Sequence, residues 1–268
     1  MPKDLVADGL ESDSATPAAV IGFDGRMGKI NVHRAVLIEL DDWSGYLAAH
    51  SGLPGPRGNL ELVAACGEEA DASRARSLVD GGDEFETVCG LVAFGRLLGR
   101  GDDDHVELLH SFAADDRWRV REGVAMALQR ACDDDPDTGF RLAEEWAGDP
   151  HPLIRRAAVA AVCEPRLLRD SGNARRALRL LDGVTAELAR SPAATRASPA
   201  VRTLRQALGY GWSVVIAALP AEGLQAFSRL ESLQDKDIQW IVRENRKKAR
   251  YSRAVKTLSP TTATPTHQ

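Results

Sequence analysis

Residues 115–162 decide the fold, because they contain one pattern twice: DDRWRVREGVAMALQRACDDDPDTGFRLAEEWAGDPHPLIRRAAVAAV. When Val120-Arg121 is aligned with Ile154-Arg155, the small and apolar residues that follow agree at an offset of 34 residues. Self-similarity at a period of about 20 to 50 residues is typical of repeat proteins, whose units cannot bury their apolar faces alone. The stretch therefore predicts two helical hairpins in tandem.

A third copy of the pattern lies near the C-terminus. The motif Trp-x-Val-Arg-Glu, which begins at Trp118, occurs again at Trp240, and the match aligns Arg243 with Arg121. Equivalent positions in a repeat array share their environment, so we expect the two tryptophans to pack between units. We expect structural roles at five repeat positions: Trp118, Arg121, Arg155, Trp240 and Arg243.

The turn before each second helix contains aspartate, and an apolar residue, an arginine and an alanine-rich helix follow it. This arrangement resembles the HEAT repeat, a member of the armadillo-like helical families. The resemblance is clearest over residues 103–163 and extends over 198–253. It implies an all-α fold, a right-handed α-solenoid of about five or six helix pairs. It also implies that turn aspartates and helix arginines form a ladder of bonds between successive units.

Composition agrees with a folded helical domain. Hydrophobic residues make up 44% of the 268 residues, which is enough for a sizeable core, while aromatic residues make up only 5%. Abundant alanine, leucine and arginine favour helix over strand. We expect the solenoid domain over residues 29–256, a poorly ordered lead-in over 1–28 and a disordered Thr/Pro-rich tail over 257–268.

Neither a membrane segment nor a metal centre is predicted. No apolar run reaches about 18 residues, and the acidic N-terminus lacks an apolar run of the signal-peptide type, so we expect a cytoplasmic protein without a membrane partner. The four cysteines are widely separated and include no CxxC pair. We expect buried reduced thiols, no metal and no cofactor.

Charge is distributed unevenly along the chain. Residues 1–135 contain 13 Lys and Arg against 26 Asp and Glu, whereas residues 136–268 contain 21 against 13. Such asymmetry indicates an anionic partner for the basic end, a basic partner docked at one end of a solenoid, or solvated helix faces of different sign. The candidate phosphate-binding or partner-binding residues are Arg155, Arg156, Arg175, Arg176, Arg179, Arg243, Arg246, Lys247, Lys248 and Arg250, with Arg253 at the end of the last cluster.

Three functions remain open from the sequence. The first is a non-catalytic scaffold or adaptor that presents a concave surface to a protein partner. The second is nucleic-acid binding through the basic C-terminal half. The third is suggested by a fold-level similarity to HEAT-like bacterial DNA-alkylation-repair glycosylases, in which aromatic residues and an acidic residue stabilise a cationic nucleotide.

Of the three functions we expect the first, a scaffold that binds a protein partner and has no enzymatic activity, because the sequence contains no glycosylase-specific motif. No catalytic residue is assigned, and the oligomeric state stays open. The residue types that a glycosylase site would need are nevertheless available, and the candidates are Trp118, Trp146, Trp212 and Trp240 with Asp115, Asp116 or Asp149.

Overall fold

The computed structural model describes residues 22–258, and every element of secondary structure within that range is a helix. The helices are α1 (Gly22–Ile38), α2 (Ser44–His50), α3 (Leu60–Glu69), α4 (Ala72–Asp80), α5 (Glu84–Gly99), α6 (Val106–Phe112), α7 (Trp118–Asp134), α8 (Pro136–Ala147), α9 (Pro152–Val162), η1 (Leu167–Arg169), α10 (Ser171–Arg190), α11 (Ala193–Arg196), α12 (Pro199–Ala218), α13 (Pro220–Glu231), α14 (Lys236–Arg246) and α15 (Ala249–Leu258). The all-α prediction is confirmed for this range.

The described chain differs at both ends from the expected domain bounds. Helix α1 begins at Gly22, inside the segment expected to be a poorly ordered lead-in, and α15 ends at Leu258, inside the expected tail. The rest of the lead-in, 1–21, and the rest of the tail, 259–268, lie outside the described residues.

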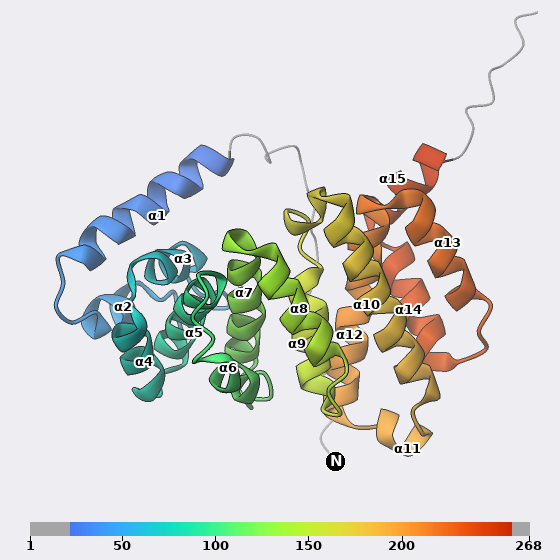
Figure 1. Cartoon of the computed structure of the whole chain (residues 1–268), viewed down its shortest axis with the longest axis horizontal. Coiled ribbons are helices and arrows are strands. Elements are labelled where there is room, and N and C mark those ends of the chain that lie inside the picture. The colour runs from blue at the N-terminus through green and yellow to red at the C-terminus, as the bar shows by residue number, and fades with distance from the viewer. Residues whose placement is uncertain (1–21, 259–268) are drawn as a thin grey trace, which may run out of the picture.

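The helices follow one another along an elongated array (Figure 1), and their contacts divide most of them into two layers. In one layer α3, α5, α7, α9, α12 and α14 each pack against the next member. In the other layer α4, α6, α8, α10 and α13 pack against α5, α7, α9, α12 and α14 respectively. Each of these contacts joins a helix to a later one in the chain, and we call the two helices a pair. We call the row of α3, α5, α7, α9, α12 and α14 the second-helix layer and the row of α4, α6, α8, α10 and α13 the first-helix layer.

Helix ends follow the local sequence. The predicted cap Asn59 accepts a hydrogen bond from the backbone N of Leu62 at 3.0 Å, and Pro152 occupies the first turn of α9, where a missing N–H breaks no helical bond. Carboxylates cap several other helices by accepting from backbone N–H groups; they belong to Asp71, Asp83, Asp135, Asp170 and Asp235. These caps fix the short turns that let consecutive helices lie side by side.

Small residues allow the second helices to approach closely. A Cβ atom on Gly95 of α5 would lie 2.1 Å from the backbone O of Ala127 on α7, so only glycine fits there. Gly209 of α12 has a similar role, because a Cβ there would lie 2.7 Å from the ring of Trp240. Trp240 of α14 therefore packs against α12.

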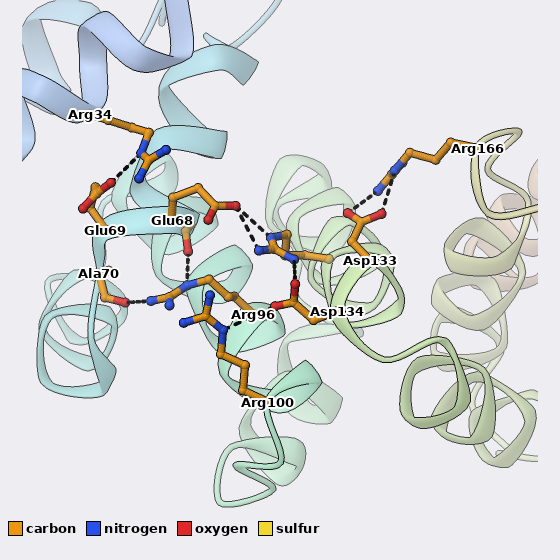
Figure 2. A network of polar contacts seen from close by, with 11 residues as sticks. Arg34, Glu68, Glu69, Ala70, Arg96, Arg100, Asp133, Asp134 and Arg166 are labelled. Atoms are coloured by element: carbon orange, nitrogen blue, oxygen red, sulfur yellow. Dashed lines mark hydrogen bonds and ion pairs between the residues drawn. The ribbon is translucent and has the colours of Figure 1, made fainter. Parts of the chain in front are cut away.

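Charged side chains join neighbouring units at the C-terminal ends of α3, α5 and α7 (Figure 2). Arg96 is only 7% exposed and donates to the backbone O of Gly67 at 2.6 Å and of Ala70 at 2.5 Å. Arg130 of α7 forms ion pairs of 3.0 Å with Glu68 of α3 and with Asp134. The same network includes Arg34 with Glu69, Arg100 with Asp134, and Arg166 with Asp133.

The arginines of the two clear repeats have a different role from the one that the HEAT resemblance implies. Arg121 donates to the backbone O of Asp115 at 2.5 Å and of Asp116 at 2.9 Å, and Arg155 donates to the backbone O of Asp149. These bonds close the turn of the arginine's own unit. They join backbone carbonyls rather than aspartate side chains, so the expected ladder between units is not formed by them.

The predicted equivalence of Arg243 with Arg121 is wrong in register. Arg121 and Arg155 are each the fourth residue of their helix, whereas Arg243 is the eighth residue of α14. The fourth residue of α14 is Gln239, which donates to the backbone O of Leu233 at 2.7 Å. The side chain of Arg243 is exposed and has no hydrogen bond or ion pair to the described residues.

Candidate binding groove

A hollow of about 600 Å³ lies on the exposed side of the second-helix layer, where α7, α9 and α12 adjoin; we call it the central hollow. Trp118, Glu122 and Met126 project from successive turns of α7 because their spacing of four residues keeps them on one helix face. Tyr210 lines the opposite side from α12, and α9 contributes Val159 among others.

Two further hollows adjoin the central one. The N-terminal hollow, of about 470 Å³, lies between α3, α5 and α7 and is lined by Phe85, Val88 and Trp118 among others. The basic hollow, of about 1100 Å³, lies between α12, α15 and the segment after α9. Trp118 lines both the N-terminal and the central hollow, and Tyr210 lines both the central and the basic hollow. Neighbouring hollows therefore meet at a shared side chain, and we call the three together the groove.

Both shared aromatic residues are accessible. Trp118 is 51% exposed and Tyr210 is 40% exposed. The guanidinium of Arg119 lies 4.6 Å from the ring centre of Trp118, and that of Arg250 lies 4.6 Å from the ring centre of Tyr210. Arg250 also donates to the hydroxyl of Tyr210 at 3.2 Å. Trp118 was expected to pack between units, but it lies on the groove at the start of α7, where no preceding helical turn covers it.

Glu122 is a groove residue that the sequence reasoning missed. It lines the central and N-terminal hollows, and Arg156 of α9 donates to its carboxylate. Arg156 is 9% exposed and also donates to the backbone O of Arg121 at 3.2 Å. Two signals could have found the pair: Glu122 follows Trp118 by one helical turn, and Arg156 follows Glu122 by the repeat offset of 34 residues.

The other tryptophans and the turn aspartates do not line the groove. Trp146 and Trp212 are buried in the core. The carboxylate of Asp115 is bound by Arg117 at 3.0 Å, and this hydrogen bond holds the pKa of Asp115 below its ordinary value. Asp149 accepts from the backbone N of His151 at 2.6 Å and lies 2.9 Å from Nε2 of His110. Asp115 and Asp149 thus organise turns.

Five of the ten predicted basic residues, Arg156, Arg175, Arg176, Arg246 and Lys247, are paired with carboxylates. Arg175 binds Glu222 at 3.0 Å and Arg176 binds Glu144 at 2.8 Å, so these arginines of α10 join it to α13 and α8 in the first-helix layer. Similar pairs join Arg246 to Glu231 and Lys247 to Glu244, each at 2.7 Å. Arg179 is exposed and its side chain forms no hydrogen bond or ion pair with the described residues, although its charge contributes to the lowered pKa of Glu144.

Two groups of the predicted cations lie on different parts of the molecule. Lys247, Lys248 and Arg250 line the basic hollow together with Arg253 and with Arg169, which the sequence reasoning missed. The arginines of α10 lie in the other layer and face neighbouring carboxylates. The C-terminal half does not present its positive charge on one surface.

Two observations concern metal binding and thiol reactivity within the described residues. No group of three or more His, Cys, Asp or Glu side chains within residues 22–258 could hold a metal ion. Burial raises the pKa of Cys132 to about 12 and also raises the pKa of Cys89 and Cys163, so these thiols stay protonated at neutral pH. Across the same residues, none of the helices combines the length and the apolar character that crossing a bilayer requires.

A scan against protein-family models finds no match to the chain, and a search of curated proteins finds no similar sequence.

Proposed function

We propose that this chain is a non-catalytic, right-handed α-solenoid of HEAT-like helix pairs. We further propose that it acts in the cytoplasm as a scaffold or adaptor and binds a protein partner along the groove. The observation that carries the proposal is the continuity of the groove across three hollows, with the half-exposed Trp118 and Tyr210 where the hollows meet. Tryptophan and tyrosine are enriched among the few residues that carry most of the binding energy of protein interfaces.

The repeat offset supports the solenoid. Arg121 and Arg155 are separated by 34 residues, occupy the same helix position and close their turns in the same way. Arg156 and Glu122, also 34 residues apart, join adjacent second helices. Stacked units of similar length place residues one repeat apart next to each other. The row of second helices then forms one surface, as in solenoids that bind extended partners.

Charge pairing favours protein over nucleic acid as the partner. Binding to DNA requires several cations that are free to neutralise phosphates. The carboxylates of Glu122, Glu144 and Glu222 already bind Arg156, Arg176 and Arg175. The central hollow combines such ion pairs with apolar side chains, a mixture typical of protein interfaces.

A relative of the DNA-alkylation-repair glycosylases is a second candidate, and one observation favours it. Trp118 and Glu122 lie together on the groove and supply the aromatic and acidic groups that such a site needs for a cationic nucleotide. The carboxylate of Glu122 is bound by Arg156, however, and this ion pair weakens the electrostatic attraction between Glu122 and a cationic ligand. Binding of duplex DNA separates the two candidates.

The proposal is tested by comparing the proteins that three tagged forms of the full chain retain from an extract of the source cells. The forms are wild type, Trp118→Ala/Tyr210→Ala, and Arg179→Ala as a surface control in the first-helix layer. We expect a protein that wild type and the control retain and that the aromatic double variant loses. Equal retention by all three forms, or retention of nuclease-sensitive material alone, would contradict the proposal.

A further inference from the structure

The basic hollow has an unbalanced charge. Its lining contains five cationic side chains and no carboxylate. Three of the five, those of Arg169, Lys248 and Arg253, have no side-chain hydrogen bond or ion pair to the described residues. Like charges held on one concave surface repel each other, and an anionic ligand relieves this repulsion.

The floor of the same hollow is apolar. Leu168 and Val214 are 3% and 2% exposed and form its base, with Pro165 and Ala218 beside them. Tyr210 stands at the boundary with the central hollow, and Arg250 lies over its ring. A ligand that fills the hollow must therefore combine negative charge with an apolar part.

The charge of the groove changes along its length. In the central hollow Arg121 and Arg156 are balanced by Glu122 and Glu164. A nucleic-acid strand carries a phosphate on every nucleotide, so its backbone would meet these carboxylates as soon as it passed Tyr210. A peptide avoids this conflict when its charged residues are confined to the end that lies in the basic hollow.

We propose that the groove binds an acidic peptide segment of its partner in one direction, with Asp or Glu side chains in the basic hollow. The apolar remainder of the segment crosses Tyr210 towards Trp118. This inference rests on the proposed function and adds the chemical class and the direction of the bound segment. Charge complementarity between partners fixes register and excludes wrong partners more than it adds affinity.

The test is a selection from a displayed library of random dodecapeptides on the full-length wild-type chain. Binding of the selected consensus peptide is then measured by fluorescence anisotropy. The variant Arg169→Glu/Arg253→Glu reverses two exposed charges of the basic hollow, and Arg179→Glu makes the same kind of change on α10. Thermal unfolding of both variants confirms that they are folded.

We expect selected peptides with Asp and Glu concentrated at one end and apolar residues at the other. The double variant should bind the consensus at least about tenfold more weakly, while Arg179→Glu leaves the affinity unchanged. Selected peptides without an acidic end, equal affinity for the double variant, or displacement of the peptide by an oligonucleotide at equal concentration would overturn the inference. A neutral consensus that still requires Trp118 would remove this inference and leave the proposed function standing.

Discussion

The side chains of Arg121 and Gln239 make the same contact in helices 118 residues apart: each donates to the carbonyl oxygen of the residue six positions earlier. In both cases the bond closes the turn between the two helices of a pair. A guanidinium and an amide can do this equally because both extend N–H donors from a flexible stem. The shared position identifies α14 as equivalent to α7, although the sequence motif suggested a different alignment.

Removal of a turn-closing donor should destabilise the fold. Arg155→Ala leaves the backbone O of Asp149 without this donor, so we expect the free energy of unfolding to fall by about 1–2 kcal/mol. Arg243→Ala removes an exposed side chain without a described partner, and we expect a change within about 0.5 kcal/mol. Urea unfolding measures both. A larger loss for Arg243→Ala than for Arg155→Ala would restore the alignment from the sequence motif.

Two glycine substitutions should change stability in opposite directions. Gly95→Ala places a methyl group against the backbone of Ala127, so the free energy of unfolding should fall by about 1–3 kcal/mol. Gly183→Ala is the matched control, because its Cβ would meet no atom within 4 Å and the residue lies within α10. There the better helix propensity of alanine should stabilise the protein by about 0.5–1 kcal/mol. Thermal unfolding distinguishes the two; a stabilising Gly95→Ala would refute the close α5 and α7 contact.

The buried Cys132 thiol gives a specific pH dependence. Its pKa is raised to about 12 in the folded chain from an unfolded value of 9.0. Between these two pH values the folded state keeps the thiol proton that the unfolded state loses. The contribution of the thiol to the free energy of unfolding is therefore complete below pH 9 and is lost as pH rises towards 12. We expect the free energy of unfolding to fall less steeply with pH in Cys132→Ala than in wild type over this window. Identical slopes for wild type and Cys132→Ala would contradict the raised pKa of the buried thiol.

Duplex DNA should bind weakly. The basic hollow is the one part of the groove where five cations lie together, so we expect a dissociation constant weaker than about 1 μM at physiological salt. The slope of log affinity against log salt should not exceed about 4.5 in magnitude for five neutralised phosphates. Fluorescence anisotropy across a salt series measures both quantities. Tight binding that Glu122→Gln weakens would favour the glycosylase-like candidate instead.

The sequence predicted the parts of the fold that depend on local pattern. The repeat offset located the pairs around α7 and α9, and capping chemistry located the start of α3 at Asn59. The Trp-x-Val-Arg-Glu match predicted an alignment of α14 with α7 that is wrong by one helical turn, because Trp118 is the first residue of α7 and Trp240 is the fifth of α14. A short motif carries no information about where its helix begins.

The site was harder to predict than the fold. The charge count located positive residues in the C-terminal half but could not show that Glu144 and Glu222 neutralise Arg176 and Arg175. Nor could it bring Arg169 to the hollow that Arg253 lines, because the two are joined only through the packing of α12 and α15. These features arise from tertiary contacts that no periodicity encodes.

The central claim is that a partner protein lies on the groove of the second-helix layer. Its most direct test places a photo-crosslinking amino acid at Gln206, which is exposed in the central hollow, and separately at Arg179 on α10. After irradiation in the source cells, mass spectrometry identifies the covalent adducts of the full-length chain. We predict one protein adduct from position 206 and none of that protein from position 179. Equal adducts from both positions, or the adduct from position 179 alone, would contradict the claim.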